Sequence, residues 1–359
     1  MKPNDLIQAV KEWDIQNPDD SMEAAAKFDA ILQQLEWFGE NEWCEYVPTE
    51  NPPHSSLYMA RLADWVGNVE TDADRQLLLE YARYIAFFSR ADFQALYRTA
   101  FSGVITRWVI EQEALSLETP DFQRRLEEEL HRRTWYCPVT DSMQIVEFYH
   151  ANHIVGTLHR PSFAPLTEID KQVPQDTGST SDVVSWLKKV IAEPDPSTSA
   201  PSFKRLVLLE DFVGTGTQSA STLLWAATHL ELPILFVPLV ICAPGVKKLT
   251  DLTEKHAPKA RVATLLKICE CDLLGPRRNG AAGIQCAERM ERLACETFAK
   301  VAGGSHTDEN LSPYSPFGFK QTGASFVSYS NTPNNTLPLV HHRPTLGGWH
   351  PLFPRSARV

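Results

Sequence analysis

The chain has 359 residues, of which 43% are hydrophobic and 22% are charged, and its formal net charge is −11. At roughly 150 residues per domain this length predicts about two domains, and so much apolar side chain excludes a largely disordered protein. The longest apolar run, from Leu232 to Ala243, contains two prolines and falls short of the roughly 20 residues that a membrane-spanning helix needs. Because no apolar segment follows the basic start, we expect no secretion signal, no membrane insertion and a cytoplasmic location.

The charge is distributed unevenly. Residues 1–136 contain 13 Lys and Arg against 25 Asp and Glu, whereas residues 137–359 contain 21 against 20. An acidic front half repels a phosphate backbone, so we predict no direct nucleic-acid binding, while the near-neutral back half leaves room for a local phosphate site.

The seven cysteines are scattered and odd in number, which favours reduced thiols over a disulfide framework. The spacing around Cys269 and Cys271, with His256 nearby, lacks the pattern of a zinc ribbon. We therefore predict no metal site built by the protein alone.

The first 135 residues show helical patterns, and we assign them to an acidic helical N-terminal region. Helices are predicted over residues 4–16, from Ser21, from Asp72 and over residues 92–115, where apolar side chains recur every three to four positions. Six of the nine tryptophans lie before residue 136. They fit an aromatic core, and they also fit a surface on which a protein partner docks.

The second half alternates between strand and helix patterns. Between the two halves, residues 183–192 suggest a short helix and residues 194–201 an exposed Pro/Ser-rich loop. The following elements are predicted: strands over 205–209, 232–242, 261–269 and 326–329, and helices over 217–230, 246–256 and 281–301. This alternation predicts an α/β fold with a parallel sheet, within a domain that covers residues 136–359.

One segment carries the strongest chemical signal. A buried strand from Arg205 ends in two acids, Glu210 and Asp211, and a loop of glycines and threonines then runs directly into a helix. The acids can accept hydrogen bonds from sugar hydroxyls or hold a hydrated Mg²⁺, while the glycines and the helix N-terminus suit a phosphate. The segment is no Walker A loop, because it lacks Gly-Lys-Ser/Thr, and no dinucleotide fingerprint, because the acids precede the glycines.

This order of acids and loop resembles the signature of type I phosphoribosyltransferases. The resemblance implies that Glu210 and Asp211 bind the ribose in a catalytic role. It also implies that the loop binds the 5′-phosphate through the following residues: Val213, Gly214, Thr215, Gly216, Thr217, Gln218 and Ser219. Two positions depart from the family pattern, since Gly214 and Gln218 stand where threonines are usual, and Ser219 offers a hydroxyl one place later.

The C-terminal segments, Ser315 to Val327 and Asn331 to Leu339, resemble the end of the phosphoribosyltransferase-like domains of bacterial conflict systems, called PRTase-CE. The resemblance spans residues ~136–355. It implies binding of 5-phosphoribosyl-1-pyrophosphate, or a related nucleotide, with Mg²⁺, and transfer or hydrolysis at the ribose C1′ in a defence system. The alternative is a catalytically inactive protein on the same fold that senses a nucleotide or binds a partner.

Several other residues have two interpretations each. Asn334 and Asn335 could present amides to a ligand or form a turn that bonds its own backbone. Phe317 or Phe319 could stack on a base or belong to the core, and Arg277–Arg278 could reach a pyrophosphate or lie in a solvated loop. The pyrophosphate loop has no clear candidate, and residues 155–160 are the nearest match.

Overall fold

A computed structural model describes most of the chain. The described residues are 1–16, 27–46, 58–155, 160, 184–185, 188–189, 191–192, 203–275, 283–303, 314–344 and 348–356. The loop expected over 194–201 and the pair Arg277–Arg278 therefore lie outside the described residues. Of the helix predicted over 183–192, the described residues 184–185, 188–189 and 191–192 are helical.

The chain forms two compact units. One unit combines Met1–Asp92 with Cys269–Val359, and the other is the continuous segment Phe93–Ile268. The division does not follow the boundary expected after residue 135. The two ends of the chain share a unit, and the middle of the chain forms the other.

The middle unit is built on a parallel sheet of five strands. The strands are β2 (Thr134–Pro138), β3 (Arg205–Val213), β4 (Ile234–Cys242), β5 (Ala260–Val262) and β6 (Leu266–Ile268). They run in the order β2-β3-β4, and β5 and β6 both pair with β4. Every residue of β2 and β4 is buried, as expected for a parallel sheet that is covered on both faces. The predicted α/β fold with a parallel sheet is confirmed.

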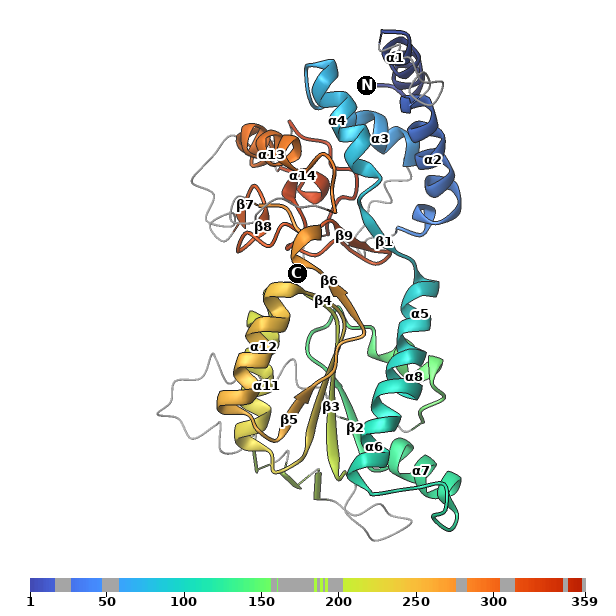
Figure 1. Ribbon diagram of the computed structural model, residues 1–359, viewed down its shortest axis with the longest axis vertical. Coiled ribbons are helices and arrows are strands. Elements are labelled where there is room, and N and C mark those ends of the chain that lie inside the picture. Colours follow the sequence, from blue (N-terminus) through green and yellow to red (C-terminus); the bar gives the residue numbers. More distant parts are fainter. Residues whose placement is uncertain are drawn as a thin grey trace. The chain divides into compact units, whose positions relative to one another are not determined.

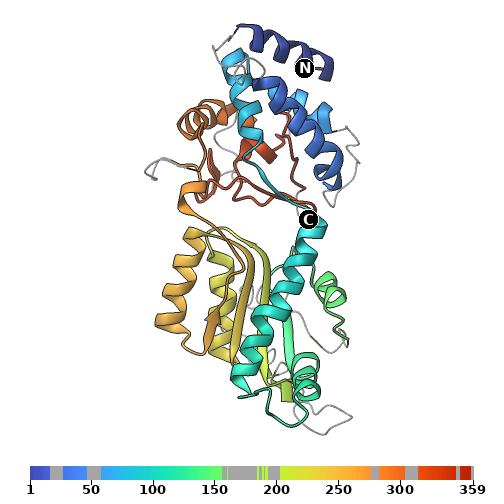
Figure 2. The same ribbon diagram turned by 45° about the vertical axis from the view of Figure 1, so that its right-hand side comes forward.

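Helices cover both faces of this sheet. Helices α11 (Thr217–His229) and α12 (Ala243–His256) lie on one face, and α5 (Arg90–Thr99), α6 (Thr106–Gln112) and α8 (Ile145–Ala151) lie on the other, as Figures 1 and 2 both show. A π-helical turn over Ala100–Ile105 joins α5 to α6, and α7 (Phe122–His131) leads into β2.

The other unit is assembled from both ends of the chain. The N-terminal end supplies α1 (Pro3–Gln16), α2 (Lys27–Asn41), a 3₁₀ turn (Trp43–Glu45), α3 (Tyr58–Val66), α4 (Asp72–Ala82) and β1 (Ala86–Phe88). The C-terminal end supplies a 3₁₀ turn (Glu270–Asp272), α13 (Ala287–Val301), β7 (Tyr314–Ser315), β8 (Gly318–Phe319), β9 (Phe326–Ser328) and α14 (Pro338–His341). One hydrophobic core contains residues from both ends, and β1 pairs in parallel with β9.

Most of the N-terminal tryptophans are core residues. Of the six before residue 136, only Trp37 is well exposed, at 53%. Trp65 donates its indole N–H to the carbonyl of Leu339, and Trp43 packs edge-on against Phe353. Trp43 and Trp65 therefore pack against the C-terminal segment of the same chain, whereas Trp108 and Trp135 belong to the middle unit.

Three predicted elements were wrong in type or extent. The front is not entirely helical, because β1 and the start of β2 are strands. Strand β3 continues four residues past Leu209 to Val213, because its ladder with β4 continues as far as the Val213–Ile241 pair. The strand expected over 261–269 is two short strands, both paired with β4.

Within the described residues, none of the helices combines the length and the apolar character required to cross a bilayer.

Candidate functional site

The turn between β3 and α11 brings the backbone into an unusual conformation. Gly216 is the N-cap of α11 and has a φ of 70°, in the left-handed region that glycine adopts without strain. Gly216 itself has no side chain that could cap this helix end. The first backbone amides of α11 therefore face the loop without the capping oxygen that Ser, Thr, Asp or Asn would provide.

Two glycines let two helix ends meet at this turn. A Cβ on Gly216 would lie 3.3 Å from both the Cα and the carbonyl oxygen of Gly245, and a Cβ on Gly245 would lie 2.8 Å from the carbonyl oxygen of Gly214. Gly245 is in the first turn of α12, which begins directly after β4. The N-termini of α11 and α12 thus lie side by side, so two helix dipoles present their positive ends to one place.

The loop also gathers hydroxyls and one cation. The hydroxyls of Thr215 and Thr217 are 3.2 Å apart, and Lys248 of α12 donates from Nζ to Thr217 Oγ1 over 3.1 Å. Gln218 is exposed and Ser219 is buried. Backbone amides, hydroxyls and an ammonium group at one loop are the donors by which proteins bind phosphate.

The two acids have different surroundings. Glu210 is 4% exposed, and its two carboxylate oxygens accept from Thr140, one from the backbone N–H at 3.0 Å and one from Oγ1 at 2.8 Å. Asp211 is half-buried, and its Oδ1 accepts from Ser142 Oγ at 2.9 Å and from the N–H of Phe212 at 2.8 Å. Both acids therefore fix the segment that follows β2, and Asp211 is the more accessible of the two.

The acids lie inside β3, not at its tip. Glu210 pairs with Pro238 of β4 and is one residue beyond the last pair that β3 makes with β2. Since β2 ends first, its continuation over residues 139–144 turns across the two acids. The site is at the carboxyl edge of the sheet, where open α/β sheets commonly bind ligands.

The two predicted asparagines lie in the other unit. Asn335 is 8% exposed, and its amide donates to Thr322 Oγ1 at 2.7 Å, while the carbonyl of Asn334 accepts from the N–H of Phe319. Gly318, with a φ of 78°, packs against the carbonyls of Asn335 and Thr336. These contacts match the interpretation of the segment as a turn that bonds within the unit, and a ligand role for the asparagines stays a prediction.

The remaining aromatic and basic candidates have these positions. Phe317 is 3% exposed and belongs to the core of its unit, whereas Phe319 is half-buried.

Arg160 donates to the backbone carbonyls of His131, Thr134 and Val155. Thr134 is the first residue of β2, so Arg160 lies at the amino end of the strand, away from the acids. Residues 156–159 lie outside the described residues.

Among the residues described, no group of three or more His, Cys, Asp or Glu side chains is placed to hold a metal ion, and the seven cysteines are free thiols. Burial, together with the charge of Glu80, raises the pKa of the Cys286 thiol to about 11.

A comparison with known families identifies the fold. Residues 62–355 match the model of the PRTase-CE family. The chain belongs to this family. The match covers most of the chain and includes parts of both compact units, so it starts well before residue 136, where the resemblance in the sequence motifs begins. No curated protein and no solved structure matches the chain.

As a PRTase-CE protein, the chain has a phosphoribosyltransferase-like domain, and its structure adds site residues that the sequence motif does not include. These are Thr140 and Ser142 beside the acids, and Gly245 and Lys248 beside the loop. Each follows the carboxyl end of a strand adjacent to β3. Gly245 and Lys248 could have been found from the predicted strand over 232–242, whereas Thr140 and Ser142 required β2 to be recognised.

Proposed function

We propose that the protein binds 5-phosphoribosyl-1-pyrophosphate, or a closely related nucleotide, with Mg²⁺ at the carboxyl edge of the middle unit's sheet. It acts on the ribose C1′, and it works in the cytoplasm as a component of a bacterial defence system. The observation that carries the proposal is the turn at Gly216, where two helix N-termini, two threonine hydroxyls and Lys248 converge.

The proposed roles follow from the positions of the groups. The 5′-phosphate accepts hydrogen bonds from the amides of the 214–219 loop, and Lys248 compensates its charge. Asp211 accepts from the ribose hydroxyls. Glu210 holds the 139–144 segment over the sugar through Thr140. In the reaction the bond from C1′ to the pyrophosphate oxygen breaks, the pyrophosphate leaves with the electron pair, and a nitrogen or water oxygen bonds to C1′.

Mg²⁺ fits this scheme as an ion that arrives on the pyrophosphate, where it offsets the charge of the leaving group. Asp211 is the half-buried carboxylate nearest the proposed sugar position, and oxygen ligands of this type suit Mg²⁺ or its bound waters.

Calorimetric titration of 5-phosphoribosyl-1-pyrophosphate with Mg²⁺ tests the proposal. We expect binding to the wild type, an affinity about tenfold lower in Lys248→Gln because one charge-assisted hydrogen bond is lost, and a similar loss in Asp211→Asn. Lys255→Gln is the matched control, since Lys255 is exposed on the same helix and lies in its last turn. Equal affinities in all four proteins, or no binding to the wild type, would refute the site.

The second candidate is a protein on the same fold that binds the nucleotide without turnover. Two observations favour it: Gln218 is exposed at the position where the family usually closes its loop with threonine, and Glu210 is already engaged by Thr140. Pyrophosphate release distinguishes the two functions. Release with any nucleobase or with water identifies an enzyme, and binding without release identifies a sensor.

A further inference from the structure

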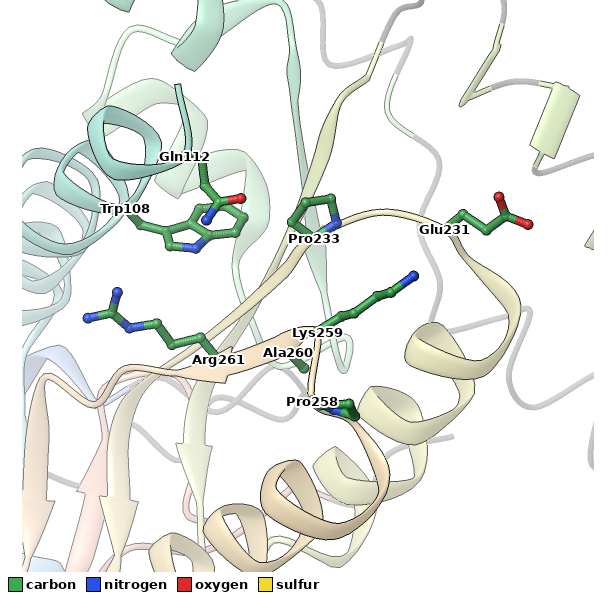
Figure 3. Close-up of a pocket in the computed structure, with 8 residues that line it drawn as sticks. All are labelled: Trp108, Gln112, Glu231, Pro233, Pro258, Lys259, Ala260 and Arg261. Atoms are coloured by element: carbon green, nitrogen blue, oxygen red, sulfur yellow. The ribbon is translucent and has the colours of Figure 1, made fainter. Parts of the chain in front are cut away.

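A pocket lies at the opposite edge of the middle unit's sheet. Its volume is about 520 Å³, within the range typical of small-molecule sites. Figure 3 shows the indole of Trp108 and the amide of Gln112 extending from α6 on one side, and the side chains of Lys259 and Glu231 on the other. Pro233 and Ala260, at the start of β4 and β5, place the pocket at the amino edge.

Three polar side chains of the pocket are exposed and are not used by the fold. Among the described residues, the side chains of Gln112, Glu231 and Lys259 have neither a hydrogen-bond partner nor an ion-pair partner. Trp108 is only 4% exposed, and its Nε1–H has no hydrogen-bond partner among the described residues. The indole ring is therefore largely buried, while its N–H stays available to a ligand.

A basic side chain at one end of the pocket is held in place. Arg261 Nη1 bonds to Glu111 Oε2 of α6 over 2.7 Å, and both residues, with Trp108, also line an adjoining space of about 170 Å³. The cation of Lys259 is therefore the charge left for a ligand.

These groups define the chemistry of a ligand. An amide that both donates and accepts, next to an indole N–H, suits the edge of a nucleobase. A carboxylate accepts from sugar hydroxyls, and an ammonium group binds a phosphate. We infer that this pocket binds a nucleoside 5′-monophosphate, or another anion that combines a base, a sugar and a phosphate. The base lies against Trp108 and Gln112, and the phosphate lies at Lys259.

This site is separate from the proposed phosphoribosyl site. The pocket is at the amino end of β4 and the glycine loop is at its carboxyl end, so the strand alone separates them by about 25–30 Å. The proposal therefore does not depend on the function of the carboxyl edge. A ligand here contacts β4, β5 and α6 without touching Asp211 or Lys248, which makes it an additional ligand and not the substrate.

Calorimetric titration of adenosine, guanosine and uridine 5′-monophosphates into the full-length chain tests the inference. We expect at least one to bind, with affinity about tenfold lower in Lys259→Gln and lower still in Gln112→Ala combined with Lys259→Gln. Lys255→Gln is again the control, because it removes an exposed positive charge four residues away that does not line the pocket. Thermal melting of each variant without ligand checks that the fold is retained.

Separate titrations with inorganic phosphate and with the unphosphorylated nucleosides identify which parts are recognised. Weaker binding of both than of the nucleotide supports the inference. Nucleotide binding that is lost in Asp211→Asn and Lys248→Gln but kept in Lys259→Gln would place the nucleotide at the carboxyl edge and overturn it. Equal binding of phosphate alone, or no binding at millimolar concentrations, would also overturn it.

Discussion

Two adjacent acids in β3 have different roles although the sequence presents them as a pair. Glu210 is buried and bonded to Thr140 through both oxygens, whereas Asp211 is partly accessible and bonded to Ser142. Alternation along a strand explains the difference, because successive side chains point to opposite faces of the sheet. Glu210 is therefore expected to matter for stability and Asp211 for the ligand.

Replacing Glu210 tests this division. Glu210→Ala leaves the buried N–H of Thr140 without its acceptor, and we expect it to lower the free energy of unfolding by about 2–3 kcal/mol. Glu210→Gln keeps an acceptor in place and should cost less than half as much, and Asp211→Asn should cost little. Urea denaturation followed by fluorescence measures all three. A loss in Asp211→Asn as large as in Glu210→Ala would contradict the assignment.

His341 gives the protein a specific sensitivity to acid. It is 2% exposed, its Nε2 donates to the carbonyl of Thr336, and its Nδ1 has no hydrogen-bond partner in the described part of the chain. Burial, together with smaller contributions from the charges of Arg355 and His342, lowers the pKa of His341 from the usual 6.5 to about 3. The folded state therefore holds this imidazole neutral.

In the unfolded chain His341 is protonated below about pH 6.5, whereas in the folded chain it is protonated only below about pH 3. Between these two values the unfolded state binds the extra proton, so the free energy of unfolding decreases as the pH falls. We expect a loss of about 2 kcal/mol at pH 5 from this residue alone, at about 1.4 kcal/mol per pH unit. His341→Gln should flatten the dependence of the melting temperature on pH between 7 and 5. An unchanged slope would show that the imidazole is protonated in the folded protein.

At the scale of elements, the glycines of the loop decide how closely α11 and α12 approach. Gly216→Val combines a strained positive φ with a Cβ that meets Gly245 at 3.3 Å. We expect the affinity for 5-phosphoribosyl-1-pyrophosphate to fall below detection and the free energy of unfolding to fall by about 2 kcal/mol. Gly103→Ala is the control, because no atom lies within 4 Å of its added Cβ, and it should leave binding unchanged. Full affinity in Gly216→Val would show that the phosphate does not use this loop.

The elements also show what the sequence could and could not predict. Apolar runs bounded by turns identified β3 and β4 and the helices that follow them, α11 and α12, and the acid-glycine pattern located the loop. Strand β2 was missed because Thr134–Pro138 directly follows α7 and contains a proline at its end, which is typical of a boundary. Strand β1 was missed because three residues carry no detectable period, and its partner β9 is more than 200 residues away.

Missing β2 affected the site as well. Without that strand, nothing in the sequence indicates that Thr140 and Ser142 lie beside Glu210 and Asp211, since about 70 residues separate them. For Asn334 and Asn335 the sequence leaves two interpretations, and the ligand role stays a prediction. The bond of Asn335 with Thr322 is set by packing, which local sequence does not reveal.

At the scale of the whole molecule, the unit made from the two chain ends depends on its C-terminal aromatics. Phe353 is fully buried and packs against Trp43, Tyr46 and Phe87 at centroid distances of 5.2–5.8 Å. We expect Phe353→Ala to lower the free energy of unfolding of this unit by about 3–5 kcal/mol, because it leaves a cavity. Ligand binding at the carboxyl edge of the middle unit's sheet should persist.

Trp37→Ala is the matched control for Phe353→Ala, since Trp37 belongs to the same unit but is half exposed, and it should cost under about 1 kcal/mol. Chemical denaturation together with calorimetric titration separates the two effects. A loss of binding that accompanies the loss of stability would mean that the two units fold as one.

Because one unit is made from both ends of the chain, its two parts are synthesised at different times. The ribosome completes the sheet-containing segment at residue 268, while the first 92 residues must wait for the last 91 before their shared core can close. The 267 residues that follow Asp92 take of the order of tens of seconds to synthesise at about 5–20 residues per second, and during that time the apolar faces of the early helices have no permanent cover. The N-terminal helices, with their buried tryptophans, are thus the part of the nascent protein with the greatest need for a chaperone, and the middle segment can reach its folded state first.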